Sequence, residues 1–160
     1  MQVRDIPAVM SIQEESYSAE LLESQAVICN RLAASPQLAW VAEDDEGVCA
    51  YLFAYRSRVG KVTPLDGEFQ PHAEADCLYL HDLAVSRRAS GRGIGPALVQ
   101  KNLEQAHSHK LRYSALVSVQ ESEAFWSRLG YAAHAELEPP QASNLASYQI
   151  PAVYMVRALH

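Results

Sequence analysis

The stretch CLYLHDLAVSRRASGRGIGPALVQ occupies residues 77–100 and predicts a strand, a glycine-rich turn and a helix in direct succession. Residues 77–85 are apolar on both faces except at His81 and Asp82, which predicts a strand in the centre of a sheet. Apolar residues at helical spacing from about Ile94 to His109 predict the helix. A strand that leads through glycines into a helix is the feature on which the functional interpretation depends.

The alternating glycines of SGRGIG, residues 90–95, permit backbone angles that direct successive NH groups into one concavity. The following helix N-terminus adds free NH groups and partial positive charge, and Arg87, Arg88 and Arg92 lie beside it. These features predict a pyrophosphate site. The spacing differs from that of dinucleotide-binding and nucleoside triphosphatase loops, and a turn that uses glycine only for close packing remains an alternative.

The rest of the chain predicts an alternation of helices and strands with no internal repeat. The expected elements are a helix over about Ile6–Tyr17, a second helix capped by Ser18, a hairpin over Leu38–Arg56, a long loop over Arg58–Ala75, a strand over Tyr113–Val119, a short helix over Ser122–Leu129, a strand from Tyr131, a proline-containing loop and a last strand over 152–159.

The composition describes an ordinary globular protein of 160 residues with 13 basic and 19 acidic side chains, a net charge of −6. An acidic chain argues against broad nucleic-acid binding and against attraction to anionic membranes. No apolar run is long enough to span a bilayer, and we expect a cytoplasmic protein. Cys29, Cys49 and Cys77 show no CxxC spacing, which predicts reduced thiols and no metal site.

LHDLAVSRRASGRGIGPALVQ (80–100) resembles the first marker of the GNAT superfamily of acyl-CoA-dependent N-acyltransferases, in which a strand leads into Q/R-x-x-G-x-G/A and a helix. VSVQESEAFWSRLGY (117–131) is similar to the second marker, a strand and a short helix that ends near F-Y-x-x-x-G-F. The resemblance implies a single acetyltransferase domain over 1–160, with its acyl-CoA-binding motifs in 77–131. It also implies a mixed α/β (α+β) fold: a mostly antiparallel mixed sheet, splayed near the strand that carries His81, with helices on both faces.

The same resemblance implies acetyl-CoA as the cosubstrate. In the best register Ser90, Gly93 and Gly95 fill the consensus, so Ser90 stands where the family usually has Arg or Gln; a shifted register begins at Arg88. We expect Arg88 or Arg92 to compensate for this departure. The resemblance assigns CoA binding to Leu83, Ala84, Val85, Arg88, Ser90, Gly91, Arg92, Gly93, Ile94, Gly95, Gln120, Ser122, Phe125 and Trp126.

A second departure is Trp126, which occupies the place of the tyrosine proposed in many relatives to protonate the CoA thiolate. An indole NH donates a hydrogen bond but supplies no proton near neutral pH. Tyr79 or a water is the substitute we expect. The base that deprotonates the amine is predicted to be His81, because Tyr79, His81, Leu83 and Val85 are expected to share one face of the strand.

Some of these residues also have a purely structural interpretation. A lone histidine on a buried strand is more often a hydrogen-bonded core residue, and Asp82, expected on the opposite face, is interpreted as structural. The acids Asp66, Glu68, Glu74 and Asp76 in the long loop favour a small cationic amine as acceptor. Tyr17, Phe69 and Tyr148 are the side chains expected to line its site.

The predicted activity is therefore transfer of an acetyl group from acetyl-CoA to a primary amine, directly in a ternary complex and without a metal. The alternatives are a non-catalytic acyl-CoA-binding sensor or partner-binding module, and an acetyltransferase that acts on protein N-termini or lysines. Homodimers are common in the resembling family, which makes a homodimer possible here.

Overall fold

Five α-helices and six strands form the computed structural model, which describes all residues from 1 to 160. They are α1 (Ile6–Ser16), α2 (Gln25–Ala34), β1 (Ala39–Asp44), β2 (Gly47–Ser57), β3 (Cys77–Val85), α3 (Ile94–Ser108), β4 (Tyr113–Ser118), α4 (Glu123–Arg128), β5 (Ala132–Ala133), α5 (Pro139–Ala146) and β6 (Val153–Ala158). The sheet order is β1-β2-β3-β4-β6-β5, and only β3 and β4 run parallel. The predicted central position of β3 and the mixed, mostly antiparallel sheet are confirmed.

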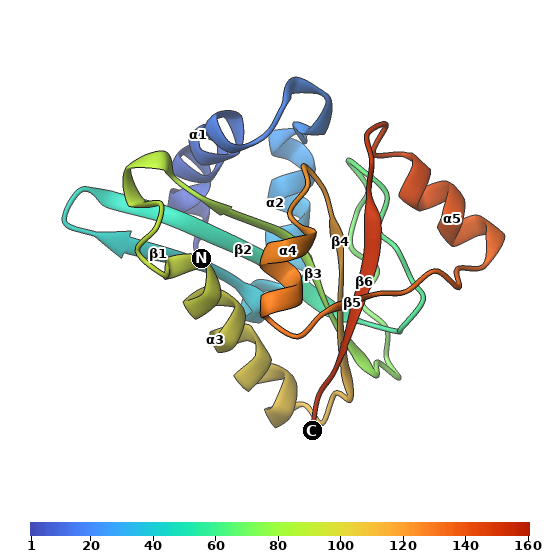
Figure 1. The fold of residues 1–160 in the computed structure, drawn as a ribbon. Helices are drawn as coiled ribbons and strands as arrows, with labels where there is room; N and C mark the ends of the chain where they lie inside the picture. Colours follow the sequence, from blue (N-terminus) through green and yellow to red (C-terminus); the bar gives the residue numbers. More distant parts are fainter.

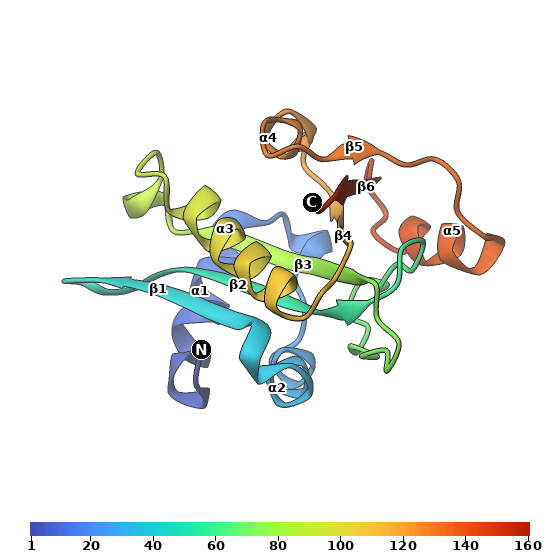
Figure 2. The same ribbon diagram turned by 90° about the horizontal axis from the view of Figure 1, so that it is seen from below.

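Helices cover both faces of the sheet, as predicted. Figures 1 and 2 show α1 and α2 on one face and α3 with α4 on the other. The first layer packs Val9 and Ile28 against aromatic side chains of the sheet such as Tyr51, and the second packs Leu98 and Leu103 against its aliphatic side chains. α1, α2 and α3 each bury apolar residues of their own sequence, and a 3.6-residue period detects such a stripe.

The sheet splays where β3 and β4 separate. These strands pair only over Cys77–Leu80 and Tyr113–Leu116, although β3 continues to Val85. Beyond this point β4 stays paired with β6 and turns away from β3, as Figure 2 shows. The backbone of β3 after Leu80 therefore has a free edge on this side, and the opening lies directly before the glycine-rich turn.

Several predicted boundaries were wrong. Ser18 precedes only a short 3₁₀ turn, and α2 begins after Ser24, whose hydroxyl accepts from the NH of Val27 at 3.3 Å. The proline-containing loop contains α5, because Pro139 and Pro140 lie in a first helical turn, where a missing NH costs nothing. The strand expected from Tyr131 is reduced to the two residues of β5.

The long loop between β2 and β3 is fastened to α5. Gln141 accepts from the NH of Val62 at 2.8 Å, Asn144 donates to the Val62 carbonyl at 2.9 Å, and Tyr148 donates to the Thr63 carbonyl at 2.9 Å. The helix missing from the sequence prediction, together with Tyr148 just after it, thus holds the loop in place. No helix of the structure is long and apolar enough to cross a membrane.

Candidate active site

A β-bulge at His81 sets the geometry of the site. Phe53 of β2 pairs with Asp82 and Ala54 pairs with Leu80, so His81 is an extra residue opposite no partner. A bulge interrupts the two-residue alternation of a strand. The prediction that Tyr79, His81, Leu83 and Val85 share one face was therefore wrong.

The bulge brings two consecutive titratable side chains to the α1 side of the sheet. His81 contacts Glu23, and Asp82 contacts Tyr17, the residue that follows α1, so both point toward the helices of the first layer. Leu83, in contrast, packs with the aliphatic cluster under α3. Asp82 consequently belongs to the same site as His81 instead of facing away from it.

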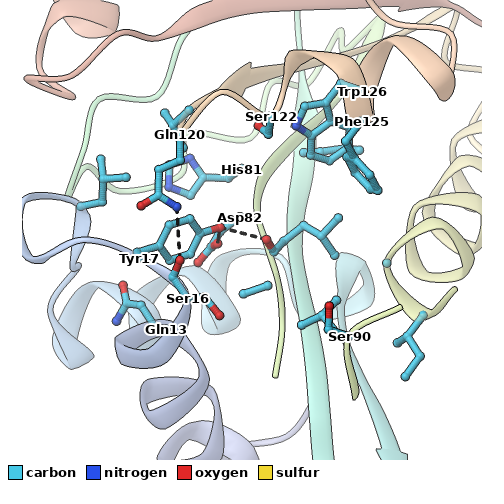
Figure 3. Close-up of a pocket in the computed structure, with 18 of the residues that line it drawn as sticks. Gln13, Ser16, Tyr17, His81, Asp82, Ser90, Gln120, Ser122, Phe125 and Trp126 are labelled. Carbon is cyan, nitrogen blue, oxygen red and sulfur yellow. Dashed lines mark hydrogen bonds between the residues drawn. The ribbon is translucent and has the colours of Figure 1, made fainter. Parts of the chain in front are cut away.

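A cavity of about 1200 Å³ extends from the glycine-rich turn through the splay to His81. It lies between β3, the N-terminus of α3, the end of β4 and the segment that follows α1. Twelve of the side chains or backbone positions predicted to bind CoA line it: Leu83, Ala84, Val85, Ser90, Gly91, Gly93, Ile94, Gly95, Gln120, Ser122, Phe125 and Trp126. Figure 3 shows several of them around the opening.

Glycine is required at two positions of the turn. Gly91 and Gly93 have φ of 77° and 76°, in the left-handed region that L-residues avoid, and Gly93 is the N-cap of α3. A Cβ atom on either would meet nothing within 4 Å, so the space beside the backbone is open. An open cradle of backbone at a helix N-terminus fits the pyrophosphate of CoA.

Arg88 and Arg92 lie outside the cavity. Arg88 donates to both carboxylate oxygens of Asp44 at 2.8 and 2.7 Å, and Arg92 donates to the same carboxylate at 2.9 Å. These two arginines hold the pKa of Asp44 down at about 2. Arg88 and Arg92, which were expected to compensate for Ser90, are thus paired with the tip of the β1–β2 hairpin. The arginine of this turn that lines the cavity is Arg87, which was not predicted to bind CoA.

His81 is held by a buried ionic network. Its Nε2 lies 3.0 Å from Glu23 Oε1, and Glu23 receives two hydrogen bonds of 2.6 Å from Arg31. The side chains of His81, Glu23 and Arg31 are 2%, 5% and 0% exposed. Burial alone would raise the Glu23 pKa, but the facing His81 and Arg31 pull it well below its usual range.

The network also fixes the tautomer of His81. Asp66 NH donates to Glu23 Oε2 at 2.8 Å, so the carboxylate accepts three hydrogen bonds apart from the His81 contact, and its lowered pKa leaves it no proton to give. His81 Nε2 must therefore be the donor toward Glu23. Nδ1 is then the nitrogen that carries the lone pair in the neutral ring, and it has no hydrogen-bond partner in the protein.

Gln13 positions Glu23 from α1. Its amide donates to the Glu23 carbonyl at 3.1 Å and accepts from the Glu23 NH at 2.7 Å, both in the interior. Sequence reasoning missed Glu23, Gln13 and Arg31 as site residues. Glu23 lies between a 3₁₀ turn and α2, outside any periodic pattern, and no local signal in the sequence marks it.

Asp82 makes a different set of contacts. It accepts from Tyr51 at 2.7 Å and lies 2.6 Å from the Tyr17 hydroxyl, which is also 2.9 Å from the Leu83 carbonyl. Burial raises the pKa of Asp82, and the charge of Glu23 raises it further. The expected structural hydrogen bonds exist, but they lie in the interior beside His81 and not at the sheet edge.

Tyr79 does not line the cavity. Its ring is buried in the first core layer against Tyr55, its hydroxyl has no hydrogen-bond partner, and burial raises its pKa well above the usual range. Trp126 is also buried and packs edge-on against Phe125 and Tyr131, although it reaches the cavity wall. Neither side chain is placed to give a proton to a bound thioester.

Gln120 joins two segments of the cavity wall near Tyr17. Its side chain accepts from the NH of Ser18 at 3.0 Å and donates to the Ser16 carbonyl at 3.2 Å, which links the end of β4 to the end of α1 (Figure 3). Tyr17 and Tyr148, which the sequence assigned to the acceptor site, both line the cavity. Phe69 instead stacks on Tyr55 in the core.

The four loop acids expected to attract a cationic amine do not line the cavity. Asp66 accepts from the NH of Ser24, Glu68 from Asn30, and Asp76 from the NH of Val59. The acids that do line the cavity are Glu15, Glu23 and Asp82. Three of these loop carboxylates thus bind groups of the protein itself. They do not indicate which acceptor the protein uses.

A family model described as the acetyltransferase (GNAT) family matches residues 6–131. The chain belongs to this family of acyl-CoA-dependent N-acyltransferases, whose acetyl donor is acetyl-CoA. The predicted family, enzyme class and cosubstrate are thereby confirmed. The comparison with curated protein sequences gave no significant match.

Three solved structures illustrate the likeness in fold. The GphF GNAT-like decarboxylase in complex with isobutyryl-CoA has a TM-score of 0.80 at 14% identity, covering 100% of this chain and 97% of that one. Ard1 from Thermoplasma volcanium has a TM-score of 0.70 at 18% identity, covering 100% and 95%. N-acetylglutamate synthase from Neisseria gonorrhoeae, complexed with coenzyme A and N-acetyl-glutamate, has a TM-score of 0.74 at 19% identity, covering 99% of this chain and 34% of that one.

Proposed function

We propose that this protein, with residues 1–160 as one acetyltransferase domain, transfers an acetyl group from acetyl-CoA to a small primary amine, with His81 as the general base. The observation that carries the proposal is the position of His81, held at the inner end of the CoA-sized cavity by Glu23 at 3.0 Å. The carboxylate fixes one nitrogen of this base, and the other nitrogen, Nδ1, is buried without a protein partner, so it is the one that we expect to accept a proton.

Acetyl-CoA supplies the acetyl group as a thioester. The open backbone at Gly91 and Gly93 and the N-terminus of α3 bind its phosphates. The free edge of β3 and the residues of α4 enclose the pantetheine arm, because the cavity follows this edge from the turn toward His81. Ser90 and Ser122 add hydroxyls to the wall.

The acceptor enters as an ammonium ion, because an alkylamine has a pKa of about 10. His81 Nδ1 takes a proton from the amine, and Glu23 stabilises the imidazolium that forms, as in other carboxylate–histidine pairs. Glu23 retains its charge throughout because Arg31 is bonded to it. Leu21, Leu65 and Tyr148 form an apolar wall at this end, which favours an amine with an apolar or aromatic body.

The first experiment is a thermal shift of the purified protein with CoA, acetyl-CoA, NADH and ATP, because a ligand of the folded state raises the melting temperature. We expect a rise with the two CoA species alone. No rise with either would contradict the cosubstrate site in this chain.

Turnover is then measured as thiol release from acetyl-CoA in a panel of primary amines and N-terminal peptides, with His81→Gln and a matched control. His107→Gln is that control, since His107 is an exposed histidine on α3. We expect His81→Gln to lower kcat by about a hundredfold or more with CoA binding retained. Equal rates for the two variants would refute the role of His81. CoA binding without turnover of any amine or peptide would favour a non-catalytic acyl-CoA-binding module.

A further inference from the structure

The Tyr17 hydroxyl faces two acceptors but has one proton to donate. It lies 2.6 Å from Asp82 Oδ1 and 2.9 Å from the Leu83 carbonyl oxygen, and the carbonyl can only accept. On the other side, Tyr51 donates to Asp82 Oδ2 at 2.7 Å. With a proton on Oδ1 of Asp82, every group has a partner: Asp82 donates to Tyr17, and Tyr17 donates to Leu83.

The surroundings of Asp82 favour the same assignment. No cationic side chain bonds to the carboxyl group, which is buried. The titratable groups that face it are Tyr17 at the end of α1, Tyr51 from β2, the neighbouring His81 and the carboxylate of Glu23. A buried carboxyl beside another negative charge keeps its proton to a higher pH than an exposed one.

We propose that Asp82 is a neutral carboxylic acid at neutral pH and that it supplies, through Tyr17, the proton that the departing thiolate of CoA takes up. In this step the Tyr17 O–H bond breaks as the S–H bond forms, and the Asp82 O–H bond breaks as the O–H bond of Tyr17 is restored. Asp82 becomes a carboxylate that Tyr51 still stabilises, and it regains a proton from water between turnovers. The step rests on the function proposed above.

The position of the pair suits this role. Tyr17 and Asp82 both line the cavity, and the Tyr17 hydroxyl touches Leu83, on the part of β3 beyond its pairing with β4. Trp126 fills the place of the family's tyrosine and cannot give a proton near neutral pH. The bulge at His81 therefore sets a base and an acid side by side, and their different partners separate their roles.

Asp82→Asn tests the protonation state without any substrate. The amide of asparagine donates to Tyr17 and accepts from Tyr51, which reproduces the hydrogen bonds of a protonated Asp82. We expect a urea midpoint at pH 7 equal to or above that of the wild type, with the CoA thermal shift retained. If Asp82 were ionised, both tyrosines would donate to it, the amide NH₂ would face a donor, and the midpoint would fall.

The pH dependence gives a second readout with a defined sign. The folded protein holds the Asp82 proton more tightly than the unfolded chain, so wild-type stability falls as pH rises above the ordinary Asp value of 3.8. Relative to Asp82→Asn, the wild-type folding equilibrium constant is expected to fall about tenfold per pH unit until the raised pKa is reached. A constant difference between the two proteins from pH 4 to 7 would overturn the proposal.

Turnover tests the proton transfer itself. We expect Asp82→Asn and Tyr17→Phe to lower kcat by about a hundredfold each, and to remove the decline of kcat at alkaline pH that a catalytic acid produces. Tyr51→Phe is the matched control, because Tyr51 contacts the same carboxyl from outside the cavity, and a smaller loss is expected. Wild-type rates in Asp82→Asn would refute the acid role even if His81→Gln were inactive, so the two proposals can fail separately.

Discussion

Removal of Arg31 is the most informative perturbation of the base. Its side chain is fully buried and gives two hydrogen bonds of 2.6 Å to Glu23, together with bonds of 3.0 and 2.6 Å to the Gly67 carbonyl. Arg31→Met leaves the buried Glu23 carboxylate without its cation. Breaking one partner of a buried ion pair costs about 3–5 kcal/mol, a large share of the stability of a domain of this size.

The double-mutant cycle separates the ion pair from other effects of Arg31. Glu23→Gln alone strands the Arg31 guanidinium, whereas Glu23→Gln with Arg31→Met removes both charges. We expect the double variant to be more stable than the sum of the two single losses predicts, by about 2–3 kcal/mol. The lost bonds to Gly67 are common to both Arg31 variants, so they cancel in the cycle.

Urea unfolding followed by circular dichroism at pH 7 measures each free energy of unfolding. Arg58→Met is the matched control, since Arg58 is exposed, and we expect a change within about 0.5 kcal/mol. The ion pair does not stabilise the fold as described if Arg31→Met lowers the free energy of unfolding by less than about 1 kcal/mol. The same follows if the losses of free energy at Glu23 and Arg31 add without coupling.

Two further predictions concern charge. The pKa of Glu23 is lowered on folding from its usual 4.5. The stabilisation that Glu23 gives is therefore complete above pH 4.5 and is lost as the pH falls toward the folded pKa. Urea midpoints at pH 7, 5 and 3 should fall more steeply for the wild type than for the Glu23→Gln/Arg31→Met protein. Asp44→Asn releases Arg88 and Arg92 beside the glycine-rich turn. CoA should then bind several-fold more tightly at low salt, with a steeper salt dependence of its affinity. Calorimetry at 20 and 200 mM NaCl measures the affinity, and an unchanged value contradicts the prediction.

The strand, turn and helix of residues 77–108 were predictable because their signals are local. A run of apolar residues, glycines at two left-handed positions and a helical period each act over a few residues. The same stretch resembles a known family motif, and the family model confirms that assignment. Twelve of the fourteen residues that the sequence assigned to CoA binding therefore line the cavity.

The end of the cavity near His81 was not predictable, because its geometry depends on contacts between distant segments. The bulge at His81 arises from the pairing of β3 with β2, and a regular alternation predicted the wrong face for Asp82. Glu23 contacts His81 where Gln13 binds the Glu23 backbone and Arg31 pairs with its carboxylate. The periodic pattern of apolar residues in a sequence does not predict contacts between distant side chains.

The charges at the His81 end of the cavity are satisfied within the protein. Glu23 is bonded to Arg31, and on our proposal Asp82 carries a proton. With so little unpaired charge at this end, we expect the acceptor to be selected by shape and by reactivity. The acceptor panel should therefore be ranked by the apolar body beside the amine and not by total positive charge, and a polyamine that outperforms arylalkyl and alkyl monoamines at high salt would show that this reasoning is wrong.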